Sequence, residues 1–305
     1  MTATTARIVG LDTAGIRTLH AEADGTADRL PHVVPVAPDL GVILADQDGA
    51  ILTAPALAEM GWADDDVLRA AVAAAQEQAG GDVAVIQPGT IVIQDPDLAV
   101  VLVLAPQAFQ GIEFRGSAVV FPVAPTTFIV TGDQDEDGLQ VAAGVAQQIL
   151  ADDEGEVLSG PPMVLRGDGW VRFEHPSLDG ELRTIRALWT ATAANLQQDA
   201  LQESFDRLQE SFDRRGEDVH VGAVSVARLA EHDPAFSYSS WTQDVETVVA
   251  AVDTIVLVTL DGQTQPVPFG RLRELASGLI EELEVRPTRY RLRGFPDLES
   301  VRAAL

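Results

Sequence analysis

The most conspicuous concentration of positive charge lies near the C-terminal end of the printed sequence, where Arg289, Arg291 and Arg293 alternate with Tyr290 and Leu292. Successive residues of a β-strand point to opposite faces of a sheet. A strand over 289–293 would therefore present three guanidinium groups on one face. Such a row could hold a carboxylate, a phosphate or an acidic partner through charge-assisted hydrogen bonds.

A fourth arginine, Arg286, lies close to this row in the sequence. The alternative to a binding role is that these arginines pair with acids of the same chain, such as Glu281, Glu282 or Glu284. Pairing of this kind is common on acidic protein surfaces. The residues alone favour this internal pairing and leave the binding role open.

A second candidate is an acidic motif in which Asp133, Asp135 and Asp137 precede Gly138. Carboxylates at positions 1, 3 and 5 with glycine at 6 are typical of the first half of a calcium-binding loop. The bidentate glutamate required at position 12 would fall on Gly144, which has no ligand. The motif also opens a predicted helix, where acids act as caps. We therefore predict capping, with at most a weak metal site.

Several kinds of catalysis are excluded by what the chain lacks. It has no cysteine, and all 20 of its basic residues are arginine, so no thiolate, lysine Schiff base or phosphate-loop lysine is possible. The five histidines form no HExxH motif, and no GxSxG, GxGxxG or Walker sequence occurs. We predict no catalytic residue and no cofactor. The absence of lysine fits either a GC-rich genome or selection against conjugation to the amine.

The charge balance bears on possible partners. Twenty Lys+Arg against 47 Asp+Glu give a net charge of −27, which repels nucleic-acid phosphates and anionic lipid surfaces. The longest apolar run, 98–106, is far shorter than the ~20 residues of a membrane-spanning helix. The first ten residues lack the pattern of a secretory signal. We expect a cytoplasmic protein that binds neither nucleic acid nor membrane.

A long helical pattern runs from Glu181 to about Arg215, with Asp179 as a possible cap. It contains a tandem heptad, LQESFDR followed by LQESFDR. The repeat places four apolar residues at coiled-coil spacing: Leu201, Phe205, Leu208 and Phe212. Two heptads are too few for a free coiled coil, so we expect this seam to dock on its own domain, on another protein or on a second copy.

The remaining pattern alternates strands and helices. We predict β-rich runs over 83–94 and 98–104 separated by a turn at 95–97, a helix over 136–150, a hairpin over 163–173, a helix over 271–283 and a strand over 289–293.

Residues 39–174 resemble the bacterial YtpQ-like family, whose chemistry is not established. The resemblance is carried by three blocks: 39–41 to 57–62 with the helix that follows, 115–132, and 163–165 with 167–170. It implies an α+β domain and transfers no catalytic residue.

These observations predict an α+β protein of two subdomains with mixed and antiparallel sheets, over 1–178 and 219–305, joined by a long amphipathic helix over 179–218. The role they favour is a non-catalytic interaction or regulatory protein, an adaptor or scaffold. The alternative is a ligand-sensing or hydrolytic domain that binds a small anion between the subdomains, with Arg289 and Arg291 lining the cleft.

Overall fold

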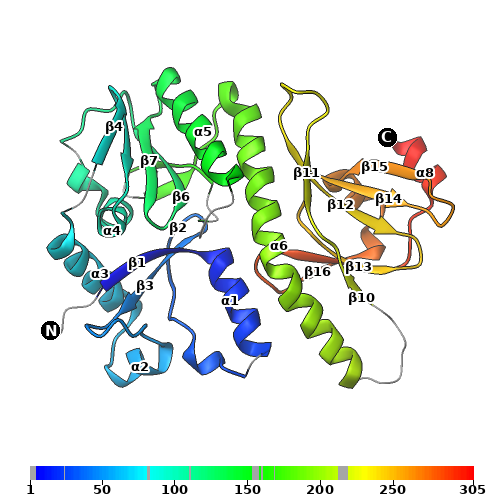
Figure 1. The fold of residues 1–305 in the computed structure, drawn as a ribbon, viewed down its shortest axis with the longest axis horizontal. Helices are drawn as coiled ribbons and strands as arrows, with labels where there is room; N and C mark the ends of the chain where they lie inside the picture. The colour runs from blue at the N-terminus through cyan, green and yellow to red at the C-terminus, as the bar shows by residue number, and fades with distance from the viewer. Residues whose placement is uncertain are drawn as a thin grey trace. The chain divides into compact units, whose positions relative to one another are not determined.

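The computed structural model describes residues 5–23, 25–80, 83–109, 111–152, 158, 161–167, 169–211 and 219–305. The chain divides into two compact units, Met1–Leu182 and Arg183–Leu305. The boundary falls inside the long helix α6 (Asp179–Ser211), so most of that helix belongs to the second unit. The predicted α+β class is confirmed (Figure 1).

The first unit contains two sheets of antiparallel strand pairs. The smaller has the order β1-β3-β2, formed by Thr5–Gly10, Leu40–Ala45 and Val34–Ala37. The larger has the order β4-β5-β7-β6-β8-β9, formed by Val83–Gln87, Thr90–Ile93, Thr127–Gly132, Ala118–Ala124, Met163–Arg166 and Gly169–Arg172. The predicted 163–173 hairpin is confirmed as β8 and β9.

Helices of the first unit cover these sheets. They are α1 (Leu11–Ala23), α2 (Ala54–Glu59), α3 (Asp64–Gln78), α4 (Pro96–Leu104) and α5 (Glu136–Ala151). α3 and α4 contact each other and β1, while α5 packs on β6 and β7 (Figure 1). The predicted helix over 136–150 is confirmed as α5.

The prediction of a β-rich run over 98–104 is wrong, because this segment forms α4. Asp95 caps the helix by accepting hydrogen bonds from the backbone N–H groups of Asp97 and Leu98 at 2.8 and 2.9 Å. Pro96 occupies the first helical turn, where its missing N–H is tolerated. The five residues 99–103 are all buried. A helix buried all round reads as a continuous apolar run, which periodicity cannot distinguish from a strand.

The second unit contains two mixed sheets. One has the order β10-β13-β17-β16, formed by Val219–Val221, Glu246–Ala250, Arg289–Leu292 and Ile280–Leu283. The other has the order β11-β12-β14-β15, formed by Ser225–Ala227, Phe236–Thr242, Thr254–Val258 and Thr264–Pro268. The short helices α7 (Phe269–Leu275) and α8 (Leu298–Ala304) follow β15 and β17.

The prediction of one helix over 271–283 is correct only for its first part. α7 ends at Leu275, and Ile280–Leu283 is instead strand β16, paired antiparallel with β17. The cross-strand partner of Glu281 is Arg291, a pairing of opposite charges that stabilises a sheet. Tertiary pairing thus overrides the local helical preference of this segment. The strand predicted at 289–293 is confirmed as β17.

Removal of the α4 cap should weaken the first unit. Asp95→Ala leaves two backbone N–H groups without their acceptor, so we expect the free energy of unfolding to fall by about 1 kcal/mol. Urea unfolding followed by circular dichroism measures this. Asp152→Ala, which removes an exposed acid at the C-terminal end of α5, is the matched control and should stay within about 0.5 kcal/mol of the wild type. Equal losses in the two variants would contradict the capping role.

Asp97 should make the fold less stable as the pH rises. Burial, together with the neighbouring Asp95, raises the pKa of the Asp97 carboxyl above 3.8, while Arg7 opposes the shift. The folded state therefore holds the proton more tightly than the unfolded state, and this contribution to stability is lost as the pH rises through the raised pKa. We expect Asp97→Asn to raise the melting temperature at neutral pH. At a pH below 3.8, where the Asp97 carboxyl is protonated in both states, the substitution should leave the melting temperature unchanged. The same gain at both pH values would show that ionisation is not the cause.

Candidate functional site

The arginine row of the second unit follows the alternation of strand β17. Tyr290 and Leu292 point into the hydrophobic core of this unit, so the arginines take the opposite face of the strand. They differ sharply in exposure, because Arg289 is fully buried, Arg291 is partly buried and Arg293 is exposed. The three arginines therefore lie on one face of β17, as predicted from the sequence, but the face is buried at its Arg289 end.

Arg289 is a structural residue. Its Nε donates to Gln197 Oε1 at 2.7 Å, and its Nη2 donates to the backbone carbonyl of Ala194 at 2.5 Å. Both acceptors belong to α6. Nη1 is buried and has no hydrogen-bond partner within the described part of the chain. Burial lowers the pKa of Arg289 from its usual value to about 10. The expectation that Arg289 lines an open anion-binding cleft is wrong, because the side chain is enclosed between β17 and α6.

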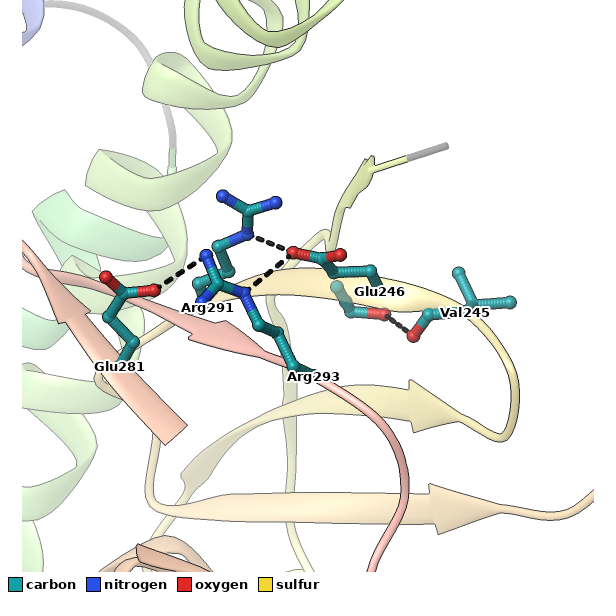
Figure 2. Close-up of polar contacts among 6 residues, drawn as sticks. Val245, Glu246, Glu281, Arg291 and Arg293 are labelled. Carbon is teal, nitrogen blue, oxygen red and sulfur yellow. Dashed lines mark hydrogen bonds and ion pairs between the residues drawn. The ribbon is translucent and has the colours of Figure 1, made fainter. Parts of the chain in front are cut away.

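Arg291 and Arg293 share one carboxylate with each other (Figure 2). Arg291 Nε donates to Glu246 Oε1, and Arg293 Nε donates to the same oxygen at 3.3 Å. Arg293 Nη2 also pairs with Glu281 Oε2 at 3.0 Å. β13 and β16, which flank β17, supply these two acids. The alternative of internal pairing is therefore confirmed for Arg291 and Arg293.

The sequence identified Glu281 as a partner because it is close along the chain, but it missed Glu246, which is brought in by the sheet. Glu246 is mostly buried, with 14% of its side chain exposed. Glu246 and Glu281 together supply two negative charges for the two guanidinium groups of Arg291 and Arg293, which are therefore already paired. Arg286 is exposed in the segment between β16 and β17.

A row of amide side chains on α6 binds backbone of the second unit, and the sequence analysis missed it. Asn195 exchanges two hydrogen bonds of 3.0 Å with the backbone of Val224. Gln202 accepts from the N–H of Val221 at 2.9 Å and donates to the carbonyl of Val219 at 3.1 Å. These contacts cover the outer edge of β10. The helical spacing of the polar residues 195, 198 and 202 places them on one face of the helix. The sequence does not indicate which backbone groups they bind.

The helix seam is only partly described. Leu201 is buried, with 3% of its surface exposed, so the chain itself covers this residue. The side chains of Phe205 and Leu208, and the whole of Phe212, lie outside the described residues. Partner binding by that part of the seam stays a prediction.

The acidic motif forms a helix cap and a loop contact. Asp135 accepts a hydrogen bond from the N–H of Gly138 at 3.3 Å and caps α5, as predicted. Asp133 accepts from the N–H of Ser117 at 2.8 Å and pairs with Arg166 at 2.8 Å.

The weak calcium candidate formed by Asp133, Asp135 and Asp137 is not supported. Within the described ranges, no three His, Asp or Glu side chains are arranged to hold a metal ion. The position that follows the motif also has a packing role, because a Cβ on Gly138 would lie 2.2 Å from Thr131 Oγ1. Only glycine fits at this contact.

One strand edge of the first unit is apolar and open. β4 is the terminal strand of the six-stranded sheet and, among the described residues, pairs with β5 alone (Figure 1). Val83, Ala84, Val85 and Ile86 are all exposed, with Val85 at 68%; we call these four residues the β4 edge. They include neither a charge nor a proline, two of the features by which proteins protect an edge strand, although the pairing of β4 with β5 shifts register between Val85 and Gln87. Exposed apolar surface of this kind is typical of an interaction site.

The other end of that sheet is differently arranged. The terminal strand β9 contacts β2, and Arg172 on β9 pairs with Asp39 at 2.6 Å. In the second unit, the amides of α6 cover the edge of β10. In the part of the chain that the structure describes, the β4 edge has neither the ion pair found on β9 nor the amide contacts found on β10.

Comparison with known proteins identified no relative: no family model, no curated protein and no solved structure matches the chain. Among the described helices, none has the length and apolar character needed to cross a membrane.

Arg289 should contribute far more to stability than Arg293. Arg289→Ala leaves Gln197 Oε1 and the Ala194 carbonyl without their donor, so we expect a loss of about 3 kcal/mol in the free energy of unfolding. Arg293→Ala removes an exposed pair and should cost less than about 1 kcal/mol. Chemical denaturation of both variants provides the comparison. Similar small losses would show that Arg289 does not hold α6.

Proposed function

We propose that this chain is a cytoplasmic protein-interaction protein, an adaptor or scaffold, that binds its partner by adding a strand to the first unit. The observation that carries the proposal is the β4 edge. The outer edge of a terminal strand offers a row of backbone N–H and C=O groups, and the exposed side chains of β4 offer apolar contacts. Membership of the YtpQ-like family remains a separate prediction.

The contacts of the arginine row weigh against the alternative of an anion-binding domain. Arg289 is enclosed and hydrogen-bonded to α6. Arg291 and Arg293 already bind Glu246. An anion would have to displace this mostly buried carboxylate, whereas a strand added to β4 would meet side chains that are exposed. Interaction through the β4 edge therefore has the better physical support.

The proposal can be tested in cells that produce the full chain with a photoreactive phenylalanine derivative at position 85. Because the residue lies on the proposed interface, illumination should join the chain to a protein of discrete mass. The matched control places the same group at Leu229, which is 86% exposed in the second unit. Analysis by mass reports the adducts. No adduct at position 85, or the same adduct from both positions, would contradict the proposal.

A further inference from the structure

We propose that the partner of the β4 edge is an extended segment with an apolar centre and basic residues at both ends, contributed by a basic protein. This inference rests on the proposed function and specifies the chemistry of the partner. It starts from two properties of the site, the neutrality of the strand and the acids near each of its ends.

The first property is the shape and neutrality of the centre. Ala84 and Val85 are neighbours in the regularly paired part of β4 and both are exposed, Val85 at 68%, although adjacent residues of a strand point to opposite faces. Both faces of β4 are therefore accessible. Its inner neighbour β5 is buried throughout and holds β4 by antiparallel pairing from Val83–Ile93 onward. An apolar strand added outside β4 could pack side chains on both faces and pair with the backbone between them.

The second property is the charge near the β4–β5 turn. Gly89 in this turn has a φ of +83°, and a Cβ placed on it would lie 3.0 Å from Asp135 Oδ2. The exposed Glu136 and Asp137 follow directly. Arg115 pairs with Asp135 at 3.6 Å. Asp133 and Asp135 are mostly buried and pair with Arg166 and Arg115. Glu136 and Asp137, which follow Asp135 in the chain, are the exposed acids of this group.

The opposite end of the strand is also acidic. Val83 is opposite Ile93, and Asp95 and Asp97 lie just beyond Ile93 at the start of α4. Arg7 is the cation that acts on Asp97. A strand added outside β4 would lie two strand spacings, roughly 10 Å, from β5. This separation is close to one Debye length at moderate salt, so these acids would attract basic residues without touching them.

A basic partner fits this surface better than a second copy does. Two copies would each bring a net charge of −27, and the acids at both ends of each strand would face acids of the other copy. Like charges placed across an interface cost free energy and slow association. A segment with arginine or lysine at both ends gains attraction at the same positions, and the chain itself cannot supply lysine because it has none.

The experiment measures binding of two labelled peptides to the full chain by fluorescence anisotropy. Both contain the centre Thr-Val-Thr-Val-Thr-Val; one has two arginines at each end, and the other has two glutamates at each end. We expect the basic peptide to bind at least about tenfold more tightly, since a difference of 1.4 kcal/mol in binding free energy is tenfold in affinity. Added salt should reduce this difference.

Two variants locate the site. Val85→Arg puts a cation and a bulky side chain on the β4 edge and should weaken binding of the basic peptide by at least about tenfold. Leu229→Arg adds the same charge to the second unit and should bind as the wild type does. Because both residues are exposed, circular dichroism and the melting temperature should show all three proteins equally folded. Equal affinity for the two peptides, or full binding by Val85→Arg, would overturn the inference.

Light scattering distinguishes failure of the basic-partner inference from failure of the proposed interaction function. We expect the wild-type chain to be a monomer. A wild-type dimer that becomes a monomer in Val85→Arg would overturn the basic partner and assign the edge to a second copy, while leaving an interaction role in place. A monomer that binds neither peptide and forms no adduct from position 85 in cells would overturn both.

Discussion

Positive charge is scarce in this molecule, and that scarcity constrains how the structure is built. The chain has 20 arginines against 47 acids, and several of these arginines bind carboxylates that lie on other elements. Arg166 reaches Asp133, Arg172 reaches Asp39, and Arg291 and Arg293 share Glu246. Arginine suits this use because its guanidinium offers several donors in a fixed geometry. Cations that hold the fold together are not available to hold an anionic ligand.

In the second unit, the long helix α6 is hydrogen-bonded to the rest of the unit through amide side chains and the buried Arg289. The guanidinium of Arg289 donates its hydrogen bonds to a backbone carbonyl and a side-chain amide oxygen, and not to a carboxylate. Asn195, Gln198 and Gln202 bind backbone of the segment from Val219 to Val224. Hydrogen bonds of this kind fix the position of the helix along the sheet, because a shift by one residue would leave buried donors and acceptors unpaired. Docking by shape alone would allow more sliding.

Local chemistry made part of this structure predictable from the sequence. The α5 helix with its Asp135 cap, the β8–β9 hairpin and the alternation along β17 follow from capping, turn residues and period-two patterning. α4 was predicted as strand because a fully buried helix has no polar face. The burial of Arg289 could not be foreseen, since it depends on α6 packing over β17. Nor could the open edge of β4, because the apolar run over 83–94 has the same pattern whether a strand lies at the edge or the centre of its sheet.

Backbone hydrogen exchange of the full chain decides whether the outer edge of β4 accepts a strand. We expect the basic peptide to slow exchange of the amides in Val83–Gln87 by pairing with that edge, while the amides of β10, which α6 already covers, exchange as before. Unchanged exchange in β4 with peptide bound, or protection confined to the second unit, would contradict pairing at that edge.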